Sequence, residues 1–407
     1  MSKYATRIPS HVGKGALPDH PAIKTPWEKL ISFHDAYHYA CRHIAVMDQA
    51  FFNVLRIVIP DYEKRCKALC DANYNNIYRV MSSPYGKIHA ENHSIHPFMA
   101  GGFLASMYGD SGDERLCMPG RLNDFGQYRC EKELDECPWD ILGSEICRAS
   151  THVLDGIGAA FGGHQLDYHM VEAKGCGDLH CRIVAESREK YPMPEHDTWE
   201  KFGPIATADQ IKYTPEDQML KEPQQFRAEC DYKYRNGLNM EMTAAEQYPG
   251  VMHPLGADYV MNTLNPMIAA NEITQEQVAF IVECVFNAAG KMAFGEFFAI
   301  KGLRDWLGVP NDVDGARVLG GYIEVMLQVL RVPYTVAAFD ENEAVYDITL
   351  ANLERRHPML THAYLSMWYG MCKTLIGSQW FAWRETEGVP GDILQLRISK
   401  KIDKFCL

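Results

Sequence analysis

The sequence predicts an α+β protein made of two tandem copies of a domain that combines helices with an antiparallel hairpin. Residues 167–186 hold two alternating apolar runs around a Gly-Cys-Gly-Asp turn, and residues 379–400 repeat this arrangement around Gly-Asp. The Gly-Asp pairs at 177–178 and 391–392 are 214 positions apart. An apolar helix that ends in glycine precedes each hairpin at the same offset, which favours two copies of one fold.

Length and composition fit a folded protein with two domains. The chain has 407 residues, of which 47% are apolar and 23% charged, values typical of globular proteins too long for one ordinary core. We expect an N-terminal arm over residues 1–26 and a first α+β copy, with the candidate active site, over 27–190. A connecting segment over 191–250 then leads to a second, degenerate copy over 251–407.

The charge balance limits the classes of partner. Asp and Glu (53) outnumber Lys and Arg (40), and the net charge of -13 repels phosphate backbones and acidic lipids. No run approaches the roughly 18–20 apolar residues of a membrane-spanning helix, and the N-terminal residues lack the apolar core of a secretion signal. We therefore expect a cytoplasmic protein that binds a small-molecule substrate, with no nucleic acid or membrane partner. A homo-oligomer is compatible with this composition.

Apolar residues at helical spacing predict two helices near the N-terminus. The first covers residues 27–59 and is closed by Pro60, and the second covers 62–81. Glycines and charges interrupt residues 101–121, which predicts a loop with at most one short helix.

A strand over 125–136 and a helix over 144–161 are predicted ahead of the first hairpin. Residues 188–237 lose periodicity, which indicates an inter-domain connection or a long functional loop.

In the second half, helical patterns cover 274–303 and 314–330. Two strands are predicted at 334–339 and 344–348, ahead of the final hairpin.

Three cysteines of the first copy lie where chemistry is expected. Cys137 ends a predicted strand, Cys147 opens a predicted helix, and Cys181 lies on the second hairpin strand. Strand alternation places Cys181 on the covered face with Ile183. At the offset of 214, Cys181 aligns with Gln395. Because glutamine is polar, we expect that the fold does not require a core-filling residue at this position.

The cysteines occur in three short motifs: Glu-Cys-Pro at 136–138, Glu-Ile-Cys at 145–147 and Gly-Asp-Leu-His-Cys-Arg at 177–182. In this order and spacing they resemble the L-2-amino-thiazoline-4-carboxylic acid hydrolase family. They also resemble the related 4-vinyl reductase domains, which include aromatic-sensing modules with a cysteine-bound zinc. The resemblance covers about 60 residues, 125–186, with a faint echo at the C-terminus.

This resemblance implies a thiol-lined or metal-lined cleft formed by Cys137, Cys147 and Cys181. By analogy with the family it also implies a ring-opening hydrolysis.

The residue types around the first hairpin leave three interpretations open. The cysteines are small apolar core residues, ligands of a metal, or a nucleophilic thiolate. Nearby proton carriers or ligands are His169, Glu172 and Asp178, and with Cys181 they form the candidate catalytic set.

Two groups of histidines are further candidates. His34 and His38 are four residues apart and share a helix face, whereas His43 is turned away from them. The other group lies in a polar loop and comprises His89, His93 and His96. The candidate metal ligands are therefore Cys137, Cys147, Cys181, His89 and His93.

These observations lead to two functional hypotheses. The first is a hydrolase that opens or hydrolyses a small cyclic substrate in an apolar pocket by thiol or metal-assisted acid–base chemistry, with Zn or Mn as the divalent metal. The second is a non-catalytic small-molecule-binding or sensing protein with a structural zinc–cysteine site. Neither a glycine-rich nucleotide loop nor a Gly-x-Ser-x-Gly motif is present, so no nucleotide cofactor is expected.

We predict that the chain contains no disulfide, because its thirteen cysteines are odd in number and no export signal is visible. Thiol titration of denatured protein that has not been reduced should approach thirteen thiols per chain. A count lower by two or more, in protein kept from air, contradicts this prediction.

Overall fold

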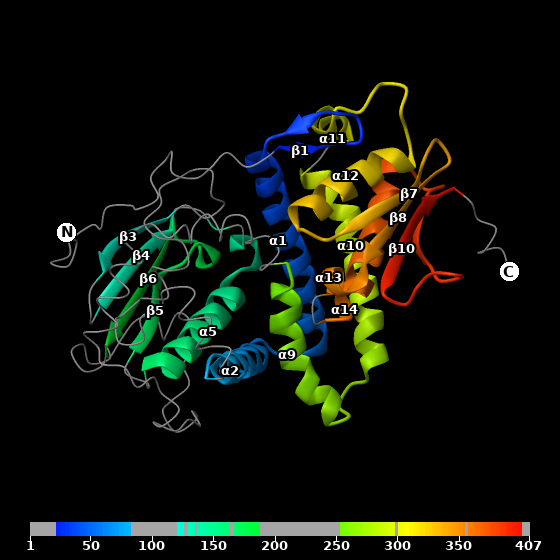
Figure 1. The fold of residues 1–407 in the computed structure, drawn as a ribbon. Coiled ribbons are helices and arrows are strands. Elements are labelled where there is room, and N and C mark those ends of the chain that lie inside the picture. The colour runs from blue at the N-terminus through cyan, green and yellow to red at the C-terminus, as the bar shows by residue number, and fades with distance from the viewer. Residues whose placement is uncertain are drawn as a thin grey trace. The chain divides into compact units, whose positions relative to one another are not determined.

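The computed structural model confirms an α+β fold in which helices combine with antiparallel sheets (Figure 1). The structure describes residues 22–82, 120–125, 129–134, 137, 139–162, 166–187, 253–297, 300–354 and 357–400. The chain divides into two compact units. The first unit comprises residues 1–19 and 61–248, and the second comprises residues 20–60 and 249–407.

The first unit contains a four-stranded sheet and two described long helices. The strands are β3 (Gly120–Phe125), β4 (Arg129–Leu134), β5 (Leu166–Glu172) and β6 (Cys181–Ser187), and the helices are α2 (Tyr62–Met81) and α5 (Ser144–Gly162). The sheet order is β3-β4-β6-β5, and every neighbouring pair is antiparallel. Helix α5 packs on α2 and on β5. A Cβ atom at Gly156 would lie 2.5 Å from the Ile77 side chain, so the close approach of the two helices requires glycine.

The second unit contains another four-stranded sheet and a larger set of helices. Its helices are α1 (Phe33–Val58), α9 (Leu255–Ala269), α10 (Gln275–Phe297), α11 (Ile300–Leu307), α12 (Ala316–Val329), α13 (Leu350–Glu354) and α14 (Met359–Met371). Its strands are β7 (Tyr334–Phe339), β8 (Glu343–Thr349), β9 (Phe381–Glu385) and β10 (Ile393–Ser399), in the order β7-β8-β10-β9. None of the helices in the described ranges has both the length and the apolar character needed to cross a bilayer.

Two glycines allow α10 and α14 to cross closely in the second unit. A Cβ atom at Gly290 would lie 2.2 Å from the Met367 carbonyl oxygen, and one at Gly370 would lie 2.3 Å from the Asn287 carbonyl oxygen. Larger residues would push the helices apart, because the contacting atoms belong to the backbone and cannot move aside as the end of a flexible side chain can.

The two sheets share strand order and details of register. Strand β7 begins and ends 214 positions after β3, and each first hairpin has an irregularity at matching places, Leu122/Asp124 and Val336/Ala338. These likenesses agree with the internal offset found in the sequence.

The register corrects one alignment made from the sequence. Leu134 pairs with Cys181 in the first sheet, and Ile348, which lies 214 positions after Leu134, pairs with Leu394 in the second. Cys181 therefore corresponds to Leu394 and not to Gln395, because the second hairpin is one residue shorter. Leu394 is fully buried. The fold thus places an apolar core residue at this position in the second unit.

Several predicted elements are observed with small shifts. Helix α2 has the predicted bounds, and α5 and the first hairpin differ from their predicted ends by one residue. The first predicted helix begins later, at Phe33, because residues 23–31 form the short antiparallel pair of β1 (Ile23–Lys24) and β2 (Leu30–Ile31). The Ser32 hydroxyl then caps the helix by accepting the Asp35 amide N–H.

Two predicted elements differ more substantially. The strand predicted over 125–136 is in fact parts of two strands, and β3 lies partly in the predicted loop at 101–121. Strand β3 has the sequence Gly-Arg-Leu-Asn-Asp-Phe, which lacks apolar alternation and therefore gave no strand signal. The helical pattern over 274–303 is divided into α10 and α11.

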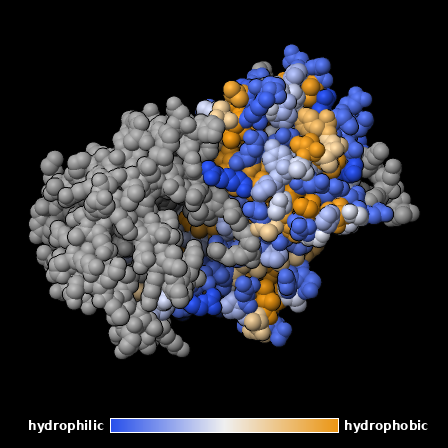
Figure 2. Space-filling view, in the orientation of Figure 1, coloured by the Kyte–Doolittle hydropathy of each residue, from blue (hydrophilic) through white to orange (hydrophobic). Residues whose placement is uncertain are grey.

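Helix α1 belongs to the second unit. It packs on α9, α10 and α12, whereas the predicted first domain, 27–190, included it. The structure therefore places the boundary near residue 60. In the view of Figure 2, hydrophobic residues on the described surface of the second unit occur in separate patches among hydrophilic ones.

The core of the second unit contains titratable groups whose pKa values burial shifts in favour of the neutral form. The His43 Nδ1 atom lies 3.0 Å from the Tyr322 hydroxyl, and burial lowers the pKa of His43 from 6.5 to about 4. Glu324 accepts a hydrogen bond from the Tyr346 hydroxyl at 3.0 Å, and burial raises the pKa of its carboxyl group.

Acid should destabilise the second unit through His43. The folded protein binds the His43 proton only near pH 4, whereas the unfolded chain binds it near pH 6.5, so stability is lost as the pH falls through this window. The loss should reach about 3 kcal/mol. We expect the free energy of unfolding of His43→Gln to depend less on pH between these values, as measured by denaturation with urea.

The matched control is His362→Gln, which removes a histidine whose side chain is 44% exposed. It should retain the acid dependence of the unchanged protein. An equal acid dependence in His43→Gln and the unchanged protein would contradict the assignment to His43.

Candidate functional site

Four cysteines of the first unit meet beside the first turn of α5. Cys137 follows β4, Cys147 lies in α5, and Cys181 begins β6. Cys176 ends a 3-10 turn over 174–176, inside the hairpin that joins β5 to β6. The three cysteines predicted from the sequence are therefore near one another, and Cys176 joins them.

The thiols make contacts in two pairs. Cys137 is hydrogen-bonded to Cys181, and Cys147 is hydrogen-bonded to Cys176. The Lys174 amide N–H also donates to the Cys181 sulfur at 3.5 Å. Three of the four cysteines come from loops or element ends, so the cluster depends on how the hairpin turn is closed.

Glycine makes the approach of the turn to α5 feasible. A Cβ atom at Gly175 would lie 2.8 Å from the Cys147 sulfur and 2.9 Å from the Gly143 carbonyl oxygen. Gly177 has φ of 96°, a left-handed conformation that favours glycine. The Gly-Cys-Gly sequence therefore allows the turn to carry Cys176 against the start of the helix.

Hydrogen bonding and burial make the thiols unequal. A hydrogen bond from Cys137 lowers the pKa of Cys181 to about 7, and the Lys174 amide contributes in the same direction. The same contact and burial raise the pKa of Cys137, and a hydrogen bond to Cys176 raises the pKa of Cys147. Cys181 is thus the thiol of the pair that ionises first.

The acidic residues predicted to move protons have structural partners. The Asp178 carboxylate accepts the Ala173 amide N–H at 2.8 Å and so closes the hairpin turn. Glu172 lies 3.8 Å from Arg182, and its side chain is 39% exposed. These contacts give Asp178 a role in holding the turn that carries Cys176.

The remaining predicted site residues are histidines. His169 lies in β5, paired with Val184, and its side chain is outside the described set, as are those of His34 and His38. His89, His93 and His96 lie outside the described residues. His43 is buried in the second unit beside Tyr322.

The cysteine side chains that the structure describes are all free thiols: Cys41, Cys66, Cys70, Cys137, Cys147, Cys176, Cys181, Cys284 and Cys372. Within the described ranges, no three His, Cys, Asp or Glu side chains are arranged to hold a metal ion. The thiols of the cluster instead contact one another in pairs. Their chemistry is that of a soft-metal donor set, but binding would require them to turn toward a common centre.

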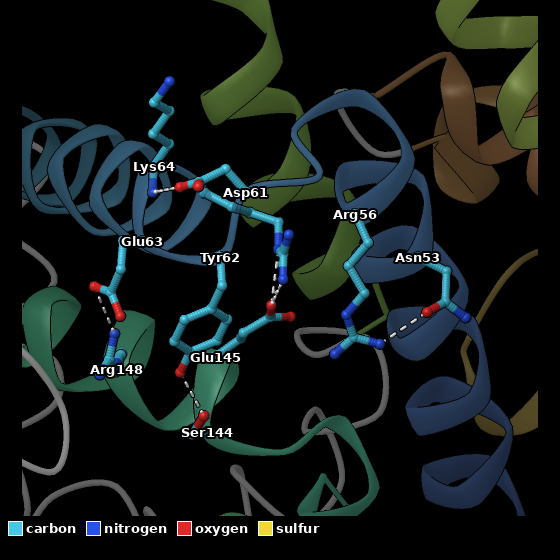
Figure 3. A network of polar contacts seen from close by, with 10 residues as sticks. Asn53, Arg56, Asp61, Tyr62, Glu63, Lys64, Ser144, Glu145 and Arg148 are labelled. Atoms are coloured by element: carbon cyan, nitrogen blue, oxygen red, sulfur yellow. Dashed lines mark hydrogen bonds and ion pairs between the residues drawn. The ribbon is translucent and has the colours of Figure 1, made fainter.

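A buried ion pair fixes the other side of the same helix turn. Arg65 on α2 donates to Glu145 Oε1 from Nε at 2.8 Å and from Nη2 at 2.5 Å. The two side chains are 8% and 5% exposed. Tyr62 lies beside this pair, with its hydroxyl 2.8 Å from the Ser144 hydroxyl (Figure 3).

Neither this network nor the position of Cys176 in the thiol cluster was predicted from the sequence. Arg65 and Glu145 are 80 positions apart, and no local pattern links them. For Cys176 a signal was present, since glycines on both sides indicate a backbone that must approach another segment closely.

Comparison with models of protein families, with curated protein sequences and with solved structures found no match to this chain.

Loss of the Glu145 carboxylate should destabilise the first unit strongly. Glu145→Gln leaves the Arg65 guanidinium buried without its counter-charge, and removing one partner of a buried pair costs about 3–5 kcal/mol. Urea denaturation should show a free energy of unfolding that is lower by this amount.

The exposed pair Lys67–Asp71 on the same helix provides the control, because its side chains are 67% and 42% exposed. Asp71→Asn should lower the free energy of unfolding by less than about 1 kcal/mol. If both variants lower the free energy of unfolding equally, the burial of the Arg65–Glu145 pair does not add to stability.

Proposed function

We propose that the first unit is a small-molecule-binding or sensing module whose four clustered cysteines bind one structural zinc ion. The observation that carries the proposal is the meeting of Cys137, Cys147, Cys176 and Cys181 at the start of α5. Four cysteine ligands are typical of closed, structural zinc sites.

The choice of zinc rests on the donor atoms. Thiolates favour zinc over manganese, which takes oxygen ligands. When bound, zinc would crosslink the segment after β4, the start of α5 and the β5–β6 hairpin. The chain's own residues already prepare this crosslink, because Asp178 and Gly175 hold the turn that presents Cys176.

The resemblance to 4-vinyl reductase domains supports the same proposal. It rests on the motifs that contain Cys137, Cys147 and Cys181, and those residues lie together in the cluster. The chain then shares with these domains a cysteine metal site and a ligand-binding role, and the ring-opening hydrolysis of the related hydrolase family is not required.

A second candidate function is hydrolysis with Cys181 as nucleophile. The Cys137 thiol and the Lys174 amide both donate to the Cys181 sulfur, and such donors stabilise a thiolate. Under this alternative a small cyclic substrate would react with Cys181. The burial of Cys181, which is 5% exposed, and the structural contact of Asp178 favour the binding module.

The metal content of the protein tests the proposal directly. Protein purified without chelators should contain about one zinc per chain by elemental analysis. Substituting Ser separately for each cysteine of the cluster should remove most of this zinc, because each variant loses one of four ligands. Cys176→Ser is the most informative variant, because the sequence alone did not include Cys176 in the site.

Two cysteines outside the cluster serve as controls. Cys70 is a buried thiol of the same unit, and Cys284 is exposed in the second unit. Cys70→Ser and Cys284→Ser should retain the zinc of the unchanged protein. Absence of zinc from the unchanged protein, also after incubation with zinc, would contradict the metal site. Rapid, selective alkylation of Cys181 in that metal-free protein would then favour the nucleophile.

A further inference from the structure

The polar network between α2 and α5 contains two buried arginines, Arg65 and Arg148, of which only Arg65 is hydrogen-bonded to a carboxylate of the residues that the structure describes. Arg65 donates two hydrogen bonds to Glu145, and both side chains are almost completely buried. Arg148 lies one turn further along α5, in the same network (Figure 3). Its side chain is also nine-tenths buried, with 10% exposed.

Arg148 lacks a comparable acceptor. The carboxylate of Glu63 is 3.8 Å from Arg148 Nη1, which is too far for a hydrogen bond, and the Glu63 side chain is 80% exposed. Within the described part of the chain, the buried Nε atom of Arg148 has no hydrogen-bond partner. A buried guanidinium group with unused donors is costly unless an acceptor binds it.

The immediate neighbours of Arg148 do not supply negative charge. Its guanidinium carbon lies 5.1 Å from the centre of the Tyr62 ring, and the Cys66 thiol is a hydrogen-bond partner. Burial raises the pKa of both Tyr62 and Cys66, so both are protonated at neutral pH. Among the residues that the structure describes, the exposed Glu63 is the carboxylate paired with Arg148.

Further donors lie on the same side of the helix. Ser144 and Arg148 are four residues apart on α5 and share a face, and Tyr62 contacts both, through its hydroxyl and its ring respectively. The first turn of a helix has backbone N–H groups without intrahelical acceptors and a partial positive charge. The first turn of α5 and Arg148 therefore both attract a negative group.

We propose that Arg148 and Ser144 form a subsite for an oxyanion, the carboxylate or phosphate group of a small molecule, which takes the place of the Glu63 carboxylate beside Arg148. Both groups have the planar or fork-like oxygen arrangement that a guanidinium recognises through two hydrogen bonds. The subsite lies apart from the thiol cluster, and its test measures anion binding, whereas the test of the proposed zinc site measures metal content.

Calorimetric titrations of the full chain with inorganic phosphate and with acetate test the subsite. We expect one anion per chain to bind, and the better of the two indicates whether the natural group is a phosphate or a carboxylate. Arg148→Gln should weaken binding by about tenfold to a hundredfold, because it removes a charge-assisted contact. Glu63→Gln should strengthen binding by about two- to fivefold, because it removes an exposed competing carboxylate.

Lys67→Gln is the matched control, since it removes one positive charge from the exposed face of α2. It should leave both affinities within about twofold of the unchanged protein. An equal loss of affinity in Lys67→Gln and Arg148→Gln would indicate general charge attraction and overturn the proposal. Binding of neither anion would overturn it too.

Folding of the variants does not limit the test. Circular dichroism will show whether Arg148→Gln retains the helix content of the unchanged protein. If it unfolds, Glu63→Gln decides, because an 80% exposed side chain can be replaced with little effect on stability. Unchanged or weaker anion binding in Glu63→Gln would then overturn the proposal.

Discussion

The antiparallel pairing of β4 with β6 determines where the functional groups of the first unit lie. It sets Leu134 opposite Cys181, and the chain reaches Cys137 three residues after Leu134. Two thiols 44 positions apart are therefore brought together by the strand register itself. The second unit uses the same register and pairs Ile348 with Leu394, both fully buried. Because Leu394 fills the corresponding position in the second unit, the fold requires a buried apolar residue there but not a thiol.

The elements that the sequence predicted well are those with regular apolar spacing. The helix over 62–81 buries one continuous face, so its period of 3.6 residues is visible without any tertiary information. The strand over 120–125 was missed because its residues do not alternate between apolar and polar. The misalignment of Cys181 arose from the irregularity at Met170/Glu172 in β5, which has no counterpart in the pairing of β9 with β10, and the Arg65–Glu145 pair depends on helix packing. Each of these is fixed by contacts between distant segments, which local patterns do not record.

In the candidate site, too, the sequence shows which residue types are present but not which residues contact one another. Cysteines with flanking glycines and charged residues identified the hairpin as the place where chemistry is expected. Residue type does not distinguish a carboxylate that moves protons from one that accepts a backbone N–H, as the Asp178 carboxylate does from Ala173. Likewise, Cys176 was not among the predicted site residues, and only the approach of Gly175 to Cys147 places it beside a partner thiol.

Helix α5 connects the thiol cluster with the buried arginines. Consecutive residues of a helix are separated by about 100°, so Cys147 faces the hairpin turn while Arg148 faces α2. The first turn is held on one side by Glu145 and Arg65 and on the other by the contact with Gly175. A helix turn moves as a rigid body, so a displacement that brings Cys147 toward a metal also moves Arg148. A metal at the proposed thiol site and an anion at the proposed subsite would therefore influence each other's affinity, and by linkage the effect would be reciprocal.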